Sequence, residues 1–305
     1  MLHHGIPKVV GRPVVTLVSS WFCPFAQRAW VALNHRGIAY DWVEALDWNK
    51  DGSYKKAPVL LEHNPQGLVP TIIGTHGSGE VATESSICVE FADDFAAAYP
   101  APASSPSSSS SQQQHEAWSN APLLPADPFL RARARVAVEW VNKKLCSPYY
   151  AVLVRKDWGE RRAAFDGLLD SLREFSAQCE ENRAERVGGG GSDDDNDDDG
   201  PFFFGNRHLS AVDVELIPWA CRYYAIDHYR SGLGHGDFSI PKDDPTLAPF
   251  HRWCEAAFAL PSVAPTIPGR QRYIDHVIKY ADGSAQSKVG DAVRAGRPAH
   301  ELKMD

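Results

Sequence analysis

The sequence predicts an α+β protein of two domains, in which a mixed β/α domain precedes an all-helical domain. Three observations lead to this prediction. Short, β-branched apolar runs alternate with helical patterns over the first hundred residues, whereas only helical periodicity follows. A segment rich in Ser, Gln and Pro separates the two regions. The chain has 305 residues, of which 43% are hydrophobic, so it is long and apolar enough for a sizeable core.

The first region follows the order β-α-β-α-β-β-α. The predicted elements are a strand at 13–18, a helix at 24–36, a strand at 39–44, a loose helix at 54–63, strands at 71–73 and 81–82, and a helix at 84–98. This order is that of a thioredoxin-like domain, in which helices cover both faces of a central sheet.

The second region is predicted to be helical throughout. Helices are expected at 127–145 and 160–179, from 210 onward, at 246–259 and at 271–280. Ser210 and Asp213 have the spacing of a capping box, which marks the start of the third helix. The expected divisions are a flexible N-terminus (1–12), the thioredoxin-like domain (13–99), a linker (100–122), the helical domain (123–284) with a disordered Gly/Asp-rich loop (187–200), and a C-terminal tail (285–305).

The charge and cysteine content narrow the class of protein. Six of the eight net negative charges come from the aspartates at 193–195 and 197–199, so the acidity belongs to one loop. That loop lacks the ligand spacing of an EF-hand, so solvated disorder is favoured over a calcium site. An acidic chain argues against a nucleic-acid partner. The six scattered cysteines fit free thiols in a reducing, cytoplasmic setting and suggest no metal site. No secretory signal and no apolar run of membrane-spanning length is visible, so no membrane partner is expected.

The motif from Trp21 to Arg28, WFCPFAQR, places a cysteine between a predicted strand and a predicted helix. Pro24 suits the first helical position, which makes Cys23 the N-cap. The free amides of Phe25 and Ala26 and the helix dipole would then favour a thiolate. Such placement lowers a thiol pKa from about 8.5 to roughly 3.5–7.5, which predicts a reactive nucleophile. The alternative is a structural cysteine packed under the helix start.

A resolving cysteine is missing from this motif. A dithiol redox motif needs a second cysteine three residues after the first, and that position is Ala26. A disulfide formed by Cys23 must therefore be resolved by an external thiol, for which glutathione is the natural candidate.

Together, four motifs make the chain similar to the cytosolic glutathione transferases, of the omega class or an omega-like branch. They are the Cys23 motif, the loop at 64–70 (NPQGLVP), the helix start at 84–88 (ESSIC) and the capping box at 210–213. The resemblance covers about residues 13–280. It implies Cys23 as the catalytic residue, a cis bond before Pro70, glutathione as co-substrate, no metal and a homodimer. It also implies the glutathione-binding residues, which are Phe25, Lys56, Val69, Pro70, Glu84 and Ser85.

Phe25 is expected to border glutathione by resemblance alone, whereas the other binding residues have a physical reason and an alternative. The Val69 backbone can pair with the cysteinyl part of glutathione as an added strand, although Pro70 could simply begin a strand. The start of the third helix suits the γ-glutamyl group, with Ser85 at its carboxylate and Glu84 at its ammonium; simple capping is the alternative. Lys56 would meet the glycyl carboxylate, but Lys55 is adjacent and the choice between them stays open.

A pocket for the acceptor substrate is expected between the domains. Trp219, Arg222 and Tyr223 follow the capping box by two to three helical turns and are the candidates for its wall, although an aromatic stripe on a helix often belongs to the core. The two low-complexity insertions depart from the family pattern without removing a site residue.

The sequence thus predicts a glutathione-dependent thiol transferase that reduces glutathione mixed disulfides and dehydroascorbate through Cys23. Conjugation of electrophiles should be weak, because a cysteine tends to form a disulfide with glutathione where a Tyr or Ser hydroxyl would hold it as a thiolate. Its substrates would be small disulfides or electrophiles and, in addition, glutathionylated proteins. The alternative is a non-catalytic glutathione-binding or ligand-carrying regulatory protein of the same fold, in which the insertions dock partners.

Overall fold

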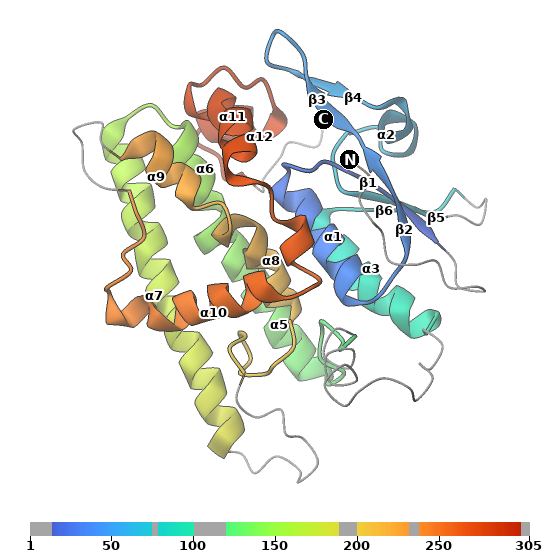
Figure 1. Cartoon of the computed structure of the whole chain (residues 1–305), viewed down its shortest axis with the longest axis vertical. Coiled ribbons are helices and arrows are strands. Elements are labelled where there is room, and N and C mark those ends of the chain that lie inside the picture. The colour runs from blue at the N-terminus through green and yellow to red at the C-terminus, as the bar shows by residue number, and fades with distance from the viewer. Residues whose placement is uncertain (1–13, 75–78, 101–119, 189–199, 232–237, 300–305) are drawn as a thin grey trace.

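The region of alternating strands and helices forms a four-stranded sheet in the computed structural model of the chain, which describes residues 14–74, 79–100, 120–188, 200–231 and 238–299. The strand order is β2-β1-β5-β6, with β1 parallel to β2 and antiparallel to β5. The elements of this domain are β1 (Val15–Ser19), α1 (Pro24–His35), β2 (Tyr40–Glu44), β3 (Leu46–Trp48), β4 (Tyr54–Lys56), α2 (Pro58–His63), β5 (Thr71–Gly74), β6 (Val81–Thr83) and α3 (Ser85–Ala98). This arrangement confirms the predicted thioredoxin-like layout (Figure 1).

The predicted helix at 54–63 is wrong over its first half. Residues Tyr54–Lys56 form β4, which pairs antiparallel with β3, and α2 begins only at Pro58. Proline fixes a helical φ and lacks the N–H that the first turn would leave unpaired, so it favours a helix start at this point. The strand β3 was not predicted, because a three-residue strand carries almost no periodicity.

The sheet buries both of its faces. Val15 and Leu17 belong to the main hydrophobic cluster, whereas Val18 packs in a smaller cluster with Leu60 of α2. Adjacent residues of a strand point to opposite faces, so one short strand supplies both cores. This explains why β1 carries apolar residues on both faces and not on one face alone.

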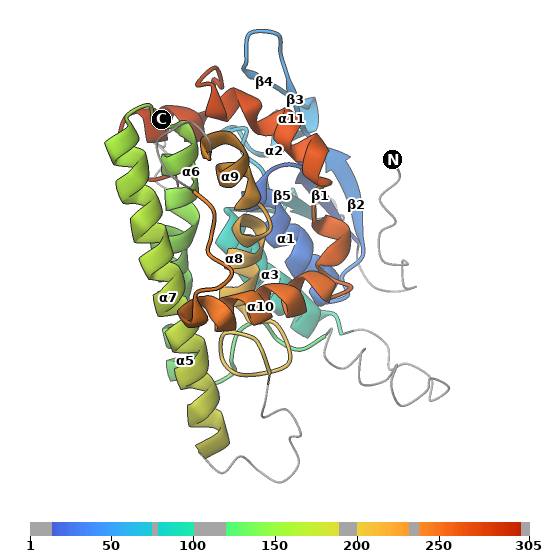
Figure 2. The ribbon, with the colours of Figure 1, turned by 60° about the vertical axis from the view of Figure 1, so that its left-hand side comes forward.

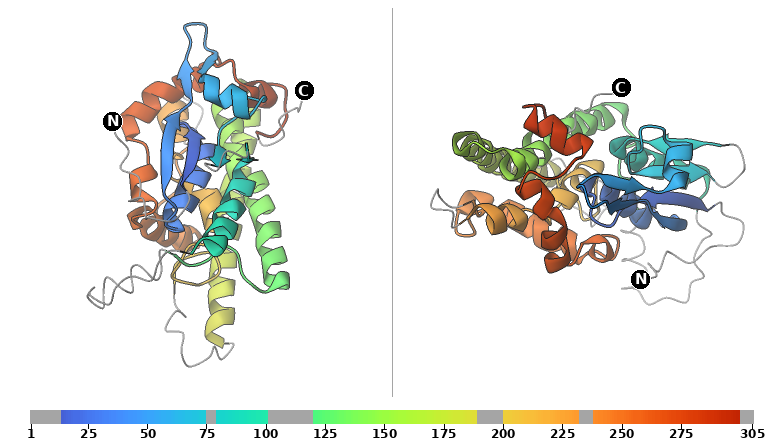
Figure 3. Two further views of the ribbon diagram at one scale, coloured as in Figure 1. Left: turned by 90° about the vertical axis from the view of Figure 1, so that its right-hand side faces the viewer. Right: turned by 90° about the horizontal axis from the view of Figure 1, so that it is seen from above.

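The second region is helical, as predicted, and lies beside the sheet domain (Figures 2 and 3). Its helices are α5 (Pro128–Val141), a π-helical turn (Asn142–Cys146), α6 (Ser147–Val154), α7 (Trp158–Gly188), α8 (Ala211–Ala220), α9 (Tyr224–Arg230), α10 (Ala248–Ala259), α11 (Arg270–Ala281) and α12 (Lys288–Arg294). The first predicted helix therefore divides at the π-helical turn and continues as α6. The long helix α7 extends beyond its predicted end at 179 and into the start of the predicted loop.

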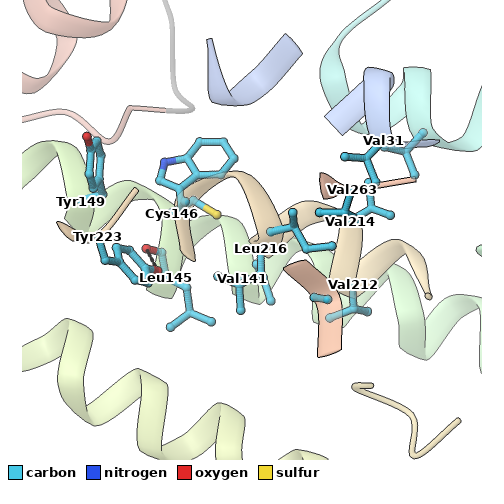
Figure 4. Packing of buried hydrophobic residues seen from close by; sticks show 14 of the residues in the cluster. Val31, Val141, Leu145, Cys146, Tyr149, Val212, Val214, Leu216, Tyr223 and Val263 are labelled. Atoms are coloured by element: carbon cyan, nitrogen blue, oxygen red, sulfur yellow. Dashed lines mark hydrogen bonds between the residues drawn. The ribbon is translucent and has the colours of Figure 1, made fainter. Parts of the chain in front are cut away.

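The predicted capping box begins α8. The Ser210 backbone N–H donates to Asp213 Oδ2 at 2.7 Å, and the Ser210 hydroxyl caps the Asp213 N–H. Asp213 also accepts from the indole of Trp253 at 2.7 Å, which ties α8 to α10. A single hydrophobic cluster, part of which appears in Figure 4, runs from the sheet domain through α8 to α10.

Several predicted segments lie outside the described residues: 1–12, most of the linker 100–122 and most of the loop 187–200. The segment from 285 to 299, predicted as a tail, contains α12, which packs against α6. Ser287 begins this helix by accepting a hydrogen bond from the Gly290 N–H at 3.0 Å. None of the described helices is long and apolar enough to cross a membrane.

Candidate active site

A cavity of about 680 Å³ lies between the two domains, with the N-terminus of α1 in its wall. Its lining brings together the predicted catalytic residue and every predicted glutathione-binding residue: Cys23, Phe25, Lys56, Val69, Pro70, Glu84 and Ser85. These residues come from four separate segments of the sheet domain. The Val69–Pro70 bond is cis, as the resemblance implied.

Cys23 is the N-cap of α1, and its extended backbone (φ −77°, ψ 116°) leads into Pro24 at the first helical position. Burial among aromatic side chains raises the pKa of the Cys23 thiol, while the amides of Phe25 and Ala26 and then the guanidinium groups of Arg222 and Arg28 oppose that rise. The expectation of a lowered pKa is therefore wrong for the unliganded protein. The helix N-terminus does favour the thiolate, but the loss of hydration outweighs it.

Arg222 is fully buried beside the cysteine motif, not in the cavity wall where it was predicted. Its Nη1 donates to Gln27 Oε1 and to the Pro218 carbonyl, and its Nη2 donates to the Phe22 carbonyl at 3.4 Å. Its acceptors here are neutral, so its positive charge remains available to an anion at Cys23.

The other two residues predicted for the acceptor pocket also belong to the core. Trp219 has no exposed surface, and its ring lies 4.3 Å below the Arg28 guanidinium. Tyr223 donates its hydroxyl hydrogen to the Leu145 carbonyl at 3.0 Å, within the apolar cluster shown in Figure 4. Helix α8 is buried on every side, so helical spacing could not separate core positions from a pocket wall.

Residues of α6 and α11, most of them aromatic, line the side of the cavity where α8 had been expected. The lining residues from these two helices are Tyr150, Tyr273, His276, Val277 and Tyr280. The spacing of 273, 277 and 280 follows one face of α11, and this periodicity was visible in the sequence as a helix but not as a pocket wall. Phe25 stacks parallel to Tyr150, with ring centroids 6.5 Å apart, and so joins the cysteine motif to this wall.

Glu84 and Ser85 form the opposite part of the site at the start of α3. Glu84 has φ +67°, the one left-handed non-glycine residue in the described chain. Such strain is characteristic of functional sites, where the surrounding structure maintains it. The Ser85 Oγ accepts from Arg28 Nη1 at 3.0 Å, which leaves the Ser85 hydroxyl hydrogen free to donate to a bound anion.

A buried charge network holds Arg28 in position. Arg28 Nε lies 2.6 Å from Glu215 Oε2, and Arg28 Nη2 donates to Asn142 Oδ1 at 2.6 Å. Asn142 begins the π-helical turn and also lines the cavity. Turns of this kind often occur at functional sites, where they reposition a side chain.

The structure distinguishes the two candidate lysines. Lys56 lines the cavity, whereas its neighbour Lys55 is exposed on the other side of β4. Burial lowers the pKa of Lys56, and the charge of Lys288 lowers it further. Its ammonium packs over Gly67, where a Cβ would lie 2.5 Å from Nζ, so a side chain at 67 would displace it.

Among the described residues, no group of three or more His, Cys, Asp or Glu side chains is arranged to hold a metal ion. All six cysteines are free, and of these Cys23 is the cysteine in the cavity lining.

The known proteins that are similar to this chain are described as glutathione S-transferases. The family model for the N-terminal domain of glutathione S-transferases matches residues 22–94. Glutathione S-transferase 3 of Glycine max is 22% identical over 267 residues, which are 87% of this chain and 94% of that protein. Glutathione S-transferase omega-1 of Sus scrofa is 26% identical over 221 residues, 72% of each chain.

Solved structures show the same fold. Glutathione transferase Omega 3C from Trametes versicolor has a TM-score of 0.62 and 24% identity, covering 90% of this chain and 92% of its own. The Tau class enzyme of mango, Mangifera indica, has a TM-score of 0.62 and 19% identity, covering 88% and 98%. Rice GST1, solved in complex with glutathione, has a TM-score of 0.61 and 20% identity, covering 90% and 98%. The N-terminal match, the cysteine motif, the helix start at Glu84 and the two-domain fold together make the chain similar to glutathione S-transferases of both the tau and the omega class.

Proposed function

We propose that this protein is a glutathione-dependent thiol transferase of omega type, with Cys23 as its nucleophile. The observation that carries the proposal is the position of Cys23 at the N-terminus of α1, in a cavity whose described lining contains no second cysteine. The position three residues later is Ala26, so an attacked disulfide would be resolved by a second glutathione.

The glutathione-binding residues have stated roles in this proposal. Ser85 donates to the γ-glutamyl carboxylate, Glu84 accepts from its ammonium, and Lys56 binds the glycyl carboxylate. The Val69 backbone pairs with the cysteinyl part beside Pro70, and Phe25 borders it. The glutathione complex of the rice relative supports glutathione as the ligand.

The reaction proceeds through two disulfide exchanges. The Cys23 thiolate attacks the glutathionyl sulfur of a mixed disulfide, forms a Cys23–glutathione disulfide and releases the other sulfur as a thiolate that takes up a proton. A second glutathione thiolate attacks that adduct, leaves as glutathione disulfide and regenerates Cys23. Dehydroascorbate would be reduced by two glutathiones through the same cysteine. Tyr150, Val277 and Tyr280 would form the acceptor wall.

The test is turnover of the mixed disulfide of glutathione and hydroxyethanethiol. Wild type should show turnover and a single glutathione adduct on Cys23 by mass spectrometry, and Cys23→Ser should lose both. Cys254→Ser is the matched control, because Cys254 lies in α10 away from the cavity lining and should keep wild-type turnover. Wild-type turnover in Cys23→Ser would refute the proposal.

A second candidate is a glutathione-binding protein without turnover. It is favoured by one observation, the burial that raises the pKa of Cys23 and reduces its thiolate fraction at neutral pH. Glutathione binding without turnover in the intact protein would select this candidate.

A further inference from the structure

The segment after α11 forms part of the cavity that contains Cys23. Its lining residues are Gln286, Ser287, Lys288, Val289, Asp291 and Ala299. The sheet domain supplies the opposite lining, and Figure 1 shows α12 close to the β3–β4 hairpin at the top of the molecule.

Hydrogen bonds to backbone carbonyls fasten this segment to the hairpin that carries Lys56. The Gln286 N–H donates to the Gly52 carbonyl at 2.9 Å, and its side-chain amide donates to the Asp51 carbonyl at 3.1 Å. Gly52 has φ +87°, and a Cβ there would lie 2.5 Å from the Ser284 carbonyl oxygen. The close approach of the two segments therefore requires glycine at this position.

This attachment brings two lysines to one cavity. Lys56 enters from β4 and Lys288 from the first turn of α12. Within the described chain neither ammonium has a carboxylate within ion-pair distance, and Asp291, the acid of α12, pairs with Arg294 at 2.5 Å. Lys56 has a single long contact, 3.5 Å to the Gln66 carbonyl. The charge of Lys288 contributes to the lowered pKa of Lys56, so the two cations repel each other across the cavity.

We propose that Lys288 is a second binding residue for the glycyl carboxylate of glutathione, which it shares with Lys56. This inference rests on the proposed function. A carboxylate has two oxygens and can accept from both ammonium groups, which would replace a repulsion with two charge-assisted hydrogen bonds. The C-terminal segment is then part of the glutathione site. Thiols with a free carboxylate that reaches Lys56 and Lys288 should bind more tightly than thiols without one.

The experiment compares the affinity of the full-length protein for two ligands by calorimetry, under reducing conditions. One ligand is glutathione, and the other is its ethyl ester on the glycyl carboxylate. Lys288→Gln should weaken glutathione binding by about three- to fivefold, the range of a partly exposed ion pair, and should leave ester binding unchanged. Lys242→Gln removes the same charge from an exposed position outside the cavity lining and should bind both ligands as wild type does.

A second variant tests the attachment of this segment to the β3–β4 hairpin separately from the charge of Lys288. Gly52→Ala should displace the Ser284 carbonyl and weaken glutathione binding, and Lys288→Gln should add little further loss in that background. Unchanged glutathione affinity in Lys288→Gln, or an equal loss for the ester, would overturn this inference and leave the proposed function standing. Failure of wild type to bind glutathione at all would overturn both.

Discussion

Arg28 of α1 and Glu215 of α8 form an ion pair across the domain interface, with Nε and Oε2 2.6 Å apart and each side chain only 1% exposed. The same guanidinium donates to Ser85 and to Asn142, both of which line the cavity. The pair therefore connects the helical domain to the residue proposed to bind the γ-glutamyl carboxylate. Loss of the Arg28–Glu215 pair should therefore affect both the stability of the fold and the position of Ser85 in the site.

Replacing Glu215 by Gln should destabilise the protein by about 3–5 kcal/mol, because Arg28 would remain buried without a counter-charge. The measurement is the free energy of unfolding in urea. Asp166→Asn is the comparison, since it breaks the exposed pair with Arg162 on α7 and should cost about 0.5 kcal/mol or less. A loss below about 1 kcal/mol in Glu215→Gln would show that neighbouring hydrogen bonds suffice to hold Arg28.

The alkylation rate of Cys23 should keep rising with pH through the neutral range. Burial raises the pKa of the thiol, so the thiolate fraction should grow about tenfold per pH unit from pH 6 to 8 without reaching a plateau. Iodoacetamide labelling, followed at Cys23 by mass spectrometry, measures this profile. A plateau below pH 7 would mean that the amides of Phe25 and Ala26 outweigh burial.

Arg222 should act on Cys23 through its charge. Its guanidinium opposes the rise in the cysteine pKa, so Arg222→Gln should slow alkylation at pH 8 by about three- to tenfold. Arg222→Lys keeps the charge and should recover much of the rate, which a purely structural role would not predict. Circular dichroism of both variants establishes that they are folded.

The buried His35 and the partly buried His276 should make the protein sensitive to acid. Burial, with smaller effects of Arg36 and His208, lowers the pKa of His35 to about 3, and burial with Lys279 and Arg272 lowers that of His276 to about 3. The unfolded chain therefore binds more protons between pH 6.5 and 3, and stability falls as the pH decreases through that window.

Each histidine should contribute a slope of up to about 1.4 kcal/mol per pH unit within this window and nothing above pH 6.5. Urea unfolding at a series of pH values measures the slope. His35→Gln and His276→Gln should each reduce it, and an unchanged slope in the double variant would contradict the assignment.

Substitution of Trp219 should affect stability, whereas substitution of Tyr280 should affect acceptor binding. Trp219→Ala should lower stability by about 3–5 kcal/mol by opening a core cavity, with no change in the KM for the acceptor in the protein that stays folded. Tyr280→Ala changes the cavity lining and should raise that KM by roughly tenfold. The mixed-disulfide assay together with thermal unfolding separates the two. A raised acceptor KM in Trp219→Ala would mean that α8 does line the acceptor pocket.

The elements that were predicted correctly depend on local chemistry. Pro24 fixes the start of α1 and thereby the N-cap position of Cys23, and Ser210 with Asp213 fixes the start of α8. Neither requires a distant contact, because a capping interaction lies within four residues. The predicted glutathione residues share one cavity because they follow strand ends and helix starts that this topology brings to a single edge of the sheet.

The elements that were missed depend on contacts distant in sequence. The strands β3 and β4 have three residues each and are defined by pairing with each other, and the segment leading into α12 is held to their hairpin by Gln286, which bonds to Asp51, 235 residues earlier. The interdomain wall of the cavity lies on α11 and not on α8, because α8 is enclosed by α1, α5 and α10, which the apolar pattern of α8 alone does not reveal.

By itself, the sequence determined the two-domain α+β architecture, the position of a single cysteine at a helix N-terminus, and the segments that bind glutathione in the proposed function. Only the tertiary structure decided that the buried Arg222 packs against the cysteine motif, that Lys56 and Lys288 enter one cavity, and that the thiol pKa is raised. The reason is physical. Turns, caps and periodicity are set by neighbours along the chain, whereas hydration and electric field at an atom are set by whatever the fold packs around it.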